Sequence, residues 1–93
     1  MKVVLDAAHA ATVLRHMEPG VRRRLKRALS LLADDPSGRS ARLDVKRLES
    51  DREQPIYRLR VGDWRIAFTV LDKVYVLRVF HRDEGYGWLV DMD

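Results

Sequence analysis

Apolar and polar residues alternate along residues 57–82, and this alternation predicts three successive β-strands over 57–61, 64–70 and 74–82. Gly62-Asp63 and residues 71–73 supply the turns between them. If the strands pair as antiparallel hairpins, one face of the sheet is apolar and suited to a core. The opposite face gathers five arginines: Arg58, Arg60, Arg65, Arg78 and Arg82. Because strand periodicity places these arginines together, we expect that face to contact a polyanion.

Two further strands and two helices are predicted before this stretch. Residues 2–5 form a short strand, and Asp6 is a suitable N-cap for a helix over 7–17. A second helix follows Glu18-Pro19-Gly20, with an apolar stripe at helical spacing that should lie on the apolar face of the sheet. Residues 44–48 form another short strand. The order β-α-α-β-β-β-β predicts an α+β fold, an antiparallel sheet backed by a helical hairpin, in one domain spanning residues 1–93.

Composition limits the possible partners. Fourteen of the 18 basic residues are arginines, and residues 1–82 carry all 18 against ten acidic residues. Guanidinium groups bind phosphate through paired hydrogen bonds and stack on bases, which favours a nucleic-acid partner, although an arginine-rich genome would give the same excess. The chain has no cysteine, and neither His9 nor His16 has a carboxylate at ligand spacing, so we expect no metal or cofactor. Without a signal peptide or an apolar run of ~20 residues, we expect a cytoplasmic protein without membrane contact.

Four segments resemble the RelE/ParE toxin superfamily of prokaryotic type II toxin–antitoxin systems: MEPGVRRRLKRALSLLADDP, DVKRL, YRLRVGDWRIAFTV and VYVLRVFHRDEGY. They are similar to the second helix, the strand core and the last strand of that superfamily, and cover nearly the whole chain. Their motifs separate its branches poorly. The resemblance implies a small, curved antiparallel sheet. It also implies an antitoxin partner that forms a hetero-oligomer with the toxin, through an acidic amphipathic segment that orders as it binds.

The two branches of the superfamily imply different functions. RelE-like toxins enter the ribosomal A site and cut mRNA, whereas ParE-like toxins inhibit DNA gyrase without catalysis. We expect the first, a metal-independent endoribonuclease whose partners are mRNA and ribosomal RNA. A gyrase inhibitor, or a degenerate member that only binds its antitoxin, remains an alternative.

The resemblance also assigns roles to the arginines. Metal-independent RNA cleavage needs a base at the 2′-hydroxyl, positive charge on the phosphorane and an acid at the leaving 5′-oxygen. Arg65 and Arg82 match the arginines that stabilise the phosphorane; their structural alternatives are ion pairs with neighbouring carboxylates (Asp63 or Asp72 for Arg65, Asp83 or Glu84 for Arg82). Arg58, Arg60 and Arg78 are expected to bind phosphate, because guanidinium stays protonated and is a poor base.

The base is left open among Tyr86, His81 and Glu84. Tyr86 matches the C-terminal tyrosine of the superfamily, which stacks on a base or orients the 2′-hydroxyl. Histidine exchanges protons readily near neutral pH, but His81 shares the parity of Val79, where a half-buried structural role is the alternative. The opposite parity of this strand runs Val76, Arg78, Phe80 and Arg82. Asp83 and Glu84 directly follow this strand, and their negative charge weakens the attraction of the arginine face for phosphate.

Overall fold

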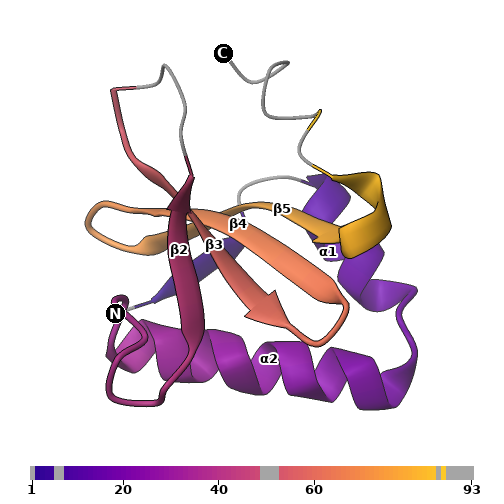
Figure 1. Ribbon diagram of the computed structural model, residues 1–93. Coiled ribbons are helices and arrows are strands. Elements are labelled where there is room, and N and C mark those ends of the chain that lie inside the picture. The colour runs from indigo at the N-terminus through magenta and orange to yellow at the C-terminus, as the bar shows by residue number, and fades with distance from the viewer. Residues whose placement is uncertain (1, 6–7, 49–52, 86, 88–93) are drawn as a thin grey trace.

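Five strands form one sheet in the order β1-β5-β4-β3-β2 (Figure 1). The computed structural model describes residues 2–5, 8–48, 53–85 and 87, so Asp6, Tyr86 and the end of the tail lie outside the described residues. The strands are β1 (Val3–Leu5), β2 (Asp44–Leu48), β3 (Ile56–Val61), β4 (Trp64–Val70) and β5 (Val74–His81). A short 3₁₀ helix, η1 (Arg82–Glu84), follows β5. The element order predicted from the sequence is confirmed.

The sheet is mixed. Strands β2 to β5 pair antiparallel, whereas β1 runs parallel to β5, with Val3 opposite Val74 and Leu5 opposite Val76. The α+β fold is therefore confirmed, with one parallel pair added to the antiparallel sheet. Residue alternation shows that a strand exists but does not give the direction of its neighbour.

Helix α1 (Ala8–Arg15) and helix α2 (Pro19–Asp34) are consecutive. Pro19 occupies the first turn of α2, where its missing N–H is not needed, so the predicted break at 18–20 is also the start of α2. The helix ends where Asp35 becomes extended before Pro36, a residue that disfavours helical conformation in its predecessor. Within the described part of the chain, no helix is long and apolar enough to cross a membrane.

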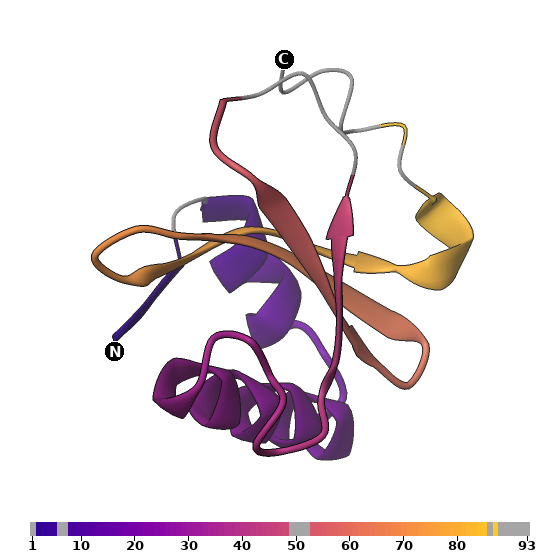
Figure 2. The same ribbon diagram turned by 60° about the vertical axis from the view of Figure 1, so that its left-hand side comes forward.

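The two helices run at a steep angle to one another (Figures 1 and 2). Helix α1 packs on β5, and α2 lies beneath the sheet, where it contacts β1 and β3. One core cluster joins both helices to one face of the sheet, which we call the inner face. As predicted, the apolar stripe of α2 contributes Leu25, Ala28, Leu29 and Leu32 to this core. The opposite, outer face of the sheet is turned away from the core.

A β-bulge interrupts the pairing of β4 with β5. Phe68 lies opposite Val76 and Ala67 lies opposite Arg78, which leaves Leu77 without a partner in β4. Val76 consequently belongs to the core, whereas Arg78 faces outward. The single parity expected from Val76 to Arg82 is wrong, because the extra residue shifts the alternation by one.

The loop between α2 and β2 is organised by the carboxylate of Asp35. Its Oδ1 accepts hydrogen bonds from the Ser37 hydroxyl at 2.7 Å and the Ser37 N–H at 3.1 Å, and its Oδ2 accepts from the Ser40 N–H at 3.0 Å. The Ser37 hydroxyl, followed by the Ser40 N–H, holds the pKa of Asp35 well below its usual value. The loop therefore depends on an ionised Asp35.

Candidate active site

The strand register brings four of the five predicted arginines together on the outer face. Arg58 and Arg78 lie on either side of Ala67, and Arg60 lies directly opposite Arg65. Positions that are opposite or diagonal on one face of a sheet are close enough for long side chains to interact. The outer face of β3, β4 and β5 therefore carries a compact group of guanidinium groups.

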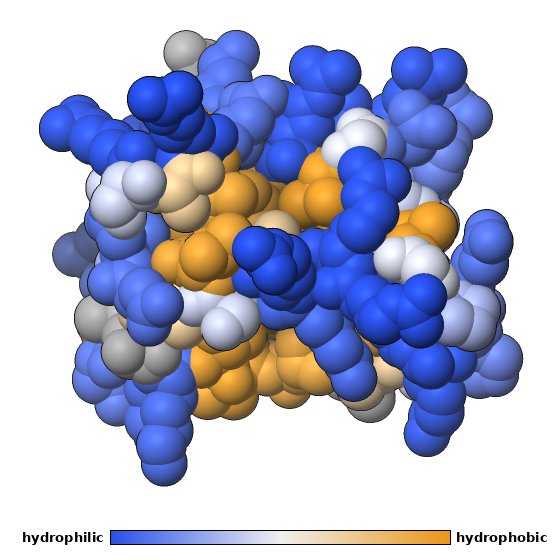
Figure 3. Space-filling view, turned by 90° about the horizontal axis from the view of Figure 1, so that it is seen from below, coloured by the Kyte–Doolittle hydropathy of each residue, from blue (hydrophilic) through white to orange (hydrophobic). Residues whose placement is uncertain are grey.

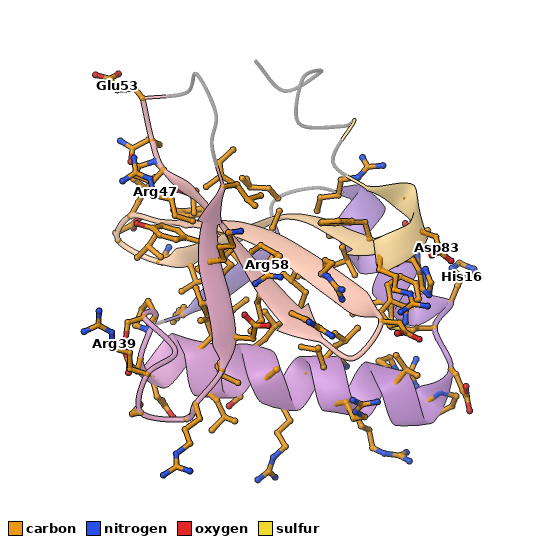
Figure 4. The ribbon with its side chains drawn as sticks, viewed as in Figure 1. His16, Arg39, Arg47, Glu53, Arg58 and Asp83 are labelled. Atoms are coloured by element: carbon orange, nitrogen blue, oxygen red, sulfur yellow. The ribbon has the colours of Figure 1, made fainter. Side chains whose placement is uncertain are left out.

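Arg58 is the most restrained of these arginines. Its Nη2 donates to Asp44 Oδ1 at 2.8 Å, and its side chain is only 13% exposed. Figure 4 shows Arg58 over the middle of the sheet, beside β2. The Arg58 Nε is buried and has no hydrogen-bond partner among the described residues. Asp44 thus fixes Arg58 in place and offsets its charge.

The other strand arginines have different surroundings. Arg78 Nη2 lies 3.8 Å from Glu84 Oε2. Arg60 is exposed and has no ion-pair partner within the described part of the chain. Arg65 Nη1 donates to the carbonyl oxygens of Gly62 at 2.8 Å and Trp64 at 3.0 Å, not to the carboxylates considered from the sequence. Neutral carbonyls hold Arg65 without removing its charge.

Arg82 lies beyond the end of β5, in η1, and not on the strand face. Its N–H donates to the Asp63 carbonyl at 2.9 Å, and its side chain lies 3.6 Å from Asp63 Oδ1 and 3.7 Å from Asp83 Oδ1. The side chain is 60% exposed. Arg82 is therefore placed beside the β3–β4 turn, next to Arg65, with two weakly held carboxylates.

His81 is not brought onto the arginine face. Its ring contacts Trp64 edge-on, with ring centroids 5.3 Å apart. Its Nδ1 accepts from the Asp83 N–H at 3.3 Å, and Glu84 accepts from the His81 N–H at 3.3 Å, which together cap η1. The same Nδ1 lies 3.3 Å from Asp83 Oδ2. These contacts favour the structural alternative for His81.

The outer face also holds an apolar cluster that sequence reasoning missed. Ile56, Ala67 and Phe80 are almost completely buried, and Leu48 and Leu77 pack against them. The sequence did indicate this cluster, because Ala67 has the parity of Arg65 in β4 and Phe80 has the parity of Arg78 in β5. An apolar surface beside guanidinium groups lowers the local dielectric and strengthens their attraction for an anion.

Across the described ranges, no three His, Asp or Glu side chains are grouped so that they could hold a metal ion. Tyr86, the tyrosine predicted to act at this site, lies outside the described residues.

Comparisons with known proteins identify the family to which the chain belongs. The family described as "ParE toxin of type II toxin-antitoxin system, parDE" matches residues 6–86. Toxin RelE3 of Methanocaldococcus jannaschii is 30% identical over 86 residues, which cover 91% of this chain and 96% of that protein.

Two solved structures have a similar fold. The RelB-RelE antitoxin-toxin complex from Methanococcus jannaschii matches with a TM-score of 0.70 and 29% identity, over 91% of this chain and 98% of the matched chain. The archaeal RelE-RelB complex from Pyrococcus horikoshii OT3 matches with a TM-score of 0.73 and 26% identity, over 87% and 93%. The chain belongs to the RelE/ParE toxin superfamily of type II toxin–antitoxin systems.

Proposed function

We propose that this chain is the toxin of a type II toxin–antitoxin pair and that it cleaves mRNA in the ribosome without a metal ion. The ribose 2′-hydroxyl attacks the adjacent phosphorus, the bond to the 5′-oxygen breaks, and a 2′,3′-cyclic phosphate and a 5′-hydroxyl form. A base takes the 2′ proton, and an acid gives a proton to the 5′-oxygen. The observation that carries the proposal is the grouping of four arginines on adjacent strands beside a buried apolar cluster.

Arg65 and Arg82 are the proposed stabilisers of the phosphorane. Hydrogen bonds from Arg65 to two backbone carbonyls fix its guanidinium before substrate arrives, which is the preorganisation that electrostatic catalysis requires. Arg82 stands at the same turn and is well exposed. Arg60 and Arg78 are better placed to bind flanking phosphates than Arg58, whose charge is already offset by Asp44.

Glu84 is the proton-transfer candidate that the contacts favour among the described residues. Its Oε1 accepts from the His81 N–H in the cap of η1, which leaves Oε2, 3.8 Å from Arg78 on the arginine face. The His81 ring lies against Trp64 instead. Tyr86 follows Glu84 closely in the chain and remains a proposed partner in the same step. Glu84→Gln keeps the hydrogen-bond acceptor but removes the base, so loss of the acid limb of the pH–rate profile would support a base role.

The test is the mapping of RNA 5′ ends in cells that express the chain. We expect cuts inside translated codons, with 5′-hydroxyl ends, and a rate about 10²–10³-fold lower for Arg65→Ala. Arg23→Ala removes an equal charge from an exposed position on α2 and serves as the matched control. Thermal unfolding of both variants separates lost chemistry from lost folding. Undiminished cutting by Arg65→Ala would overturn the assigned role.

Gyrase inhibition is the second candidate, because the matching family is described as ParE toxin. The relatives and solved structures bear the name RelE, which supports the nuclease. Growth arrest without new RNA ends, accompanied by altered plasmid supercoiling, would move the conclusion to gyrase. If neither growth arrest nor RNA cutting occurs, the chain is a degenerate member that only binds its antitoxin.

An antitoxin is the proposed protein partner. Both solved relatives are described as complexes of RelE with RelB. A pocket of about 560 Å³ on the side of the molecule away from η1 is suited to an acidic segment with an apolar anchor, because Val45, Tyr57 and Val70 line it together with Arg39 and Arg47 (Figure 4). Co-expression of toxin and antitoxin should restore growth and yield a stable complex.

A further inference from the structure

Three arginines from three different elements meet at the β3–β4 turn. Arg65 of β4 donates to the Gly62 carbonyl, and Arg82 of η1 lies 3.6 Å from Asp63. The third is Arg24, which reaches the same turn from α2. Figure 1 shows this turn extending toward α2. The turn therefore joins the arginine face to the basic helix.

The guanidinium of Arg24 approaches Gly62 with its two terminal nitrogens. A Cβ on Gly62 would be 3.1 Å from Arg24 Nη2, 3.6 Å from Nη1 and 3.7 Å from Cζ. Because both terminal nitrogens lie nearer to this position than Cζ does, the Nη1–Nη2 edge of the group is turned toward Gly62. The φ of Gly62 is +59°, so glycine supplies both the turn conformation and the room for this approach.

Arg24 and Arg65, like Arg60, have no carboxylate among the described residues that offsets their charge. Arg58, Arg78 and Arg82 each have a carboxylate within 4 Å. Neither Arg24 nor Arg65 has an ion-pair partner among the residues that the structure describes. Arg24 is also exposed. Two uncompensated guanidinium groups thus flank one turn, one on each side.

We propose that Arg24 binds a backbone phosphate of the same RNA strand whose scissile phosphate contacts Arg65. The binding track then passes from the outer face of the sheet, over Gly62-Asp63, onto the flank of α2. Arg24 is exposed and its guanidinium carries five N–H groups, so it can donate two hydrogen bonds to phosphate oxygens. The inference rests on the proposed function for the identity of the ligand as single-stranded RNA.

The surface beyond Arg24 continues the same charge. Exposed Arg27 lies three residues after Arg24, about one turn along α2, and therefore on the same flank of the helix. Seen from the α2 side, hydrophilic side chains dominate the face, with hydrophobic areas between them (Figure 3). Lys26 lies two residues after Arg24, about 200° around the helix axis, and therefore on the other flank of α2. It provides a control of equal charge at a different place.

The test measures binding of the full-length protein to a fluorescent 12-nucleotide 2′-O-methyl RNA, which lacks the attacking hydroxyl, between 50 and 300 mM salt. For single strands, one phosphate contact contributes about 0.7 to the slope of log affinity against log salt, which corresponds to about fivefold in affinity at 0.1 M salt. Arg24→Gln should show losses of this size in both quantities. Lys26→Gln should show clearly smaller losses.

Equal losses of RNA affinity in the two variants would mean that Arg24 acts only through the net charge, and would overturn the inference. So would a wild-type protein that does not bind the RNA at 50 mM salt, or an Arg24→Gln variant that loses affinity only for the antitoxin. Cleavage of translated mRNA by the wild type is scored separately. If Arg24→Gln weakens RNA binding as expected but no cleavage occurs, the proposed function fails and the binding track stands.

Discussion

The same strands form the inner and outer faces of the sheet, yet the side chains of the two faces have different roles. On the inner face Leu59, Ile66 and Phe68 are fully buried against the helices. On the outer face arginines surround a smaller apolar cluster that includes Phe80. The difference teaches that a binding face need not be polar throughout. Long arginine stems pack on apolar surface while their charged ends remain available.

The strongest test of this comparison removes one phenylalanine from each face. Phe68→Ala should lower the free energy of unfolding by about 3–5 kcal/mol, because it leaves a cavity in a closely packed core. Phe80→Ala should have an effect in the same range if the outer cluster is a second core. Urea unfolding measures both. Arg60→Ala, an exposed change on the outer face, should stay within about 0.5 kcal/mol.

If Phe80→Ala lowered the free energy of unfolding by less than about 1 kcal/mol, the outer cluster would not be a second core. It would mean that the apolar cluster beside the arginines contributes little to folding. The burial of Phe80 and its neighbours would then have to be explained by RNA binding alone.

A smaller effect is expected from the ion pair on the outer face. Asp44→Asn leaves the poorly exposed Arg58 guanidinium without its carboxylate, and should cost about 1 kcal/mol, since Asp44 itself is 52% exposed and screened by water. High salt should reduce the difference between variant and wild type. Glu53→Gln, at an exposed carboxylate without an ion pair among the described residues, is the matched control. Identical losses in both variants would show that the Arg58–Asp44 pair adds nothing.

The smallest effect belongs to a region outside both faces, the loop held by Asp35. Because its pKa is lowered in the folded protein, Asp35 stabilises the fold above the unfolded-state value near 3.8, and this contribution is lost as the pH falls below it. Urea unfolding from pH 7 to pH 2 should show wild type and Asp35→Asn converging below about pH 4. If the free energies of unfolding of the two proteins ran parallel over this pH range, Asp35 would not be the source of the acid sensitivity.

Sequence reasoning recovered the parts of the fold that depend on local periodicity. Alternation in β3 and β4 correctly placed Arg58, Arg60 and Arg65 on one face, and helical spacing correctly placed Leu25 and Leu29 in the core. The parallel pairing of β1 with β5 was not predicted, because its partners are about 70 residues apart and no local pattern specifies them.

The candidate site was recovered less completely, for related physical reasons. The Arg58–Asp44 pair depends on the register of β2 with β3, and the contact of Arg24 with Gly62 depends on how α2 docks. No pattern among neighbouring residues in the sequence predicts either interaction. The cap formed by His81 required knowledge that the chain turns into η1 directly after β5. The role of Tyr86 stays a prediction.

The bulge at Leu77 has a consequence for how this chain can change in length. Leu77 is the supernumerary residue of β5, since Val76 and Arg78 pair with consecutive residues of β4. Its deletion would restore a regular ladder and leave every later side chain on its present face, at the loss of the contacts that Leu77 makes with the outer cluster. Deletion of Arg78 would restore the same ladder but would put Leu77 opposite Ala67, so the outer face would lose an arginine. Strand β5 can therefore lose one residue at the bulge without moving its later side chains to the other face of the sheet.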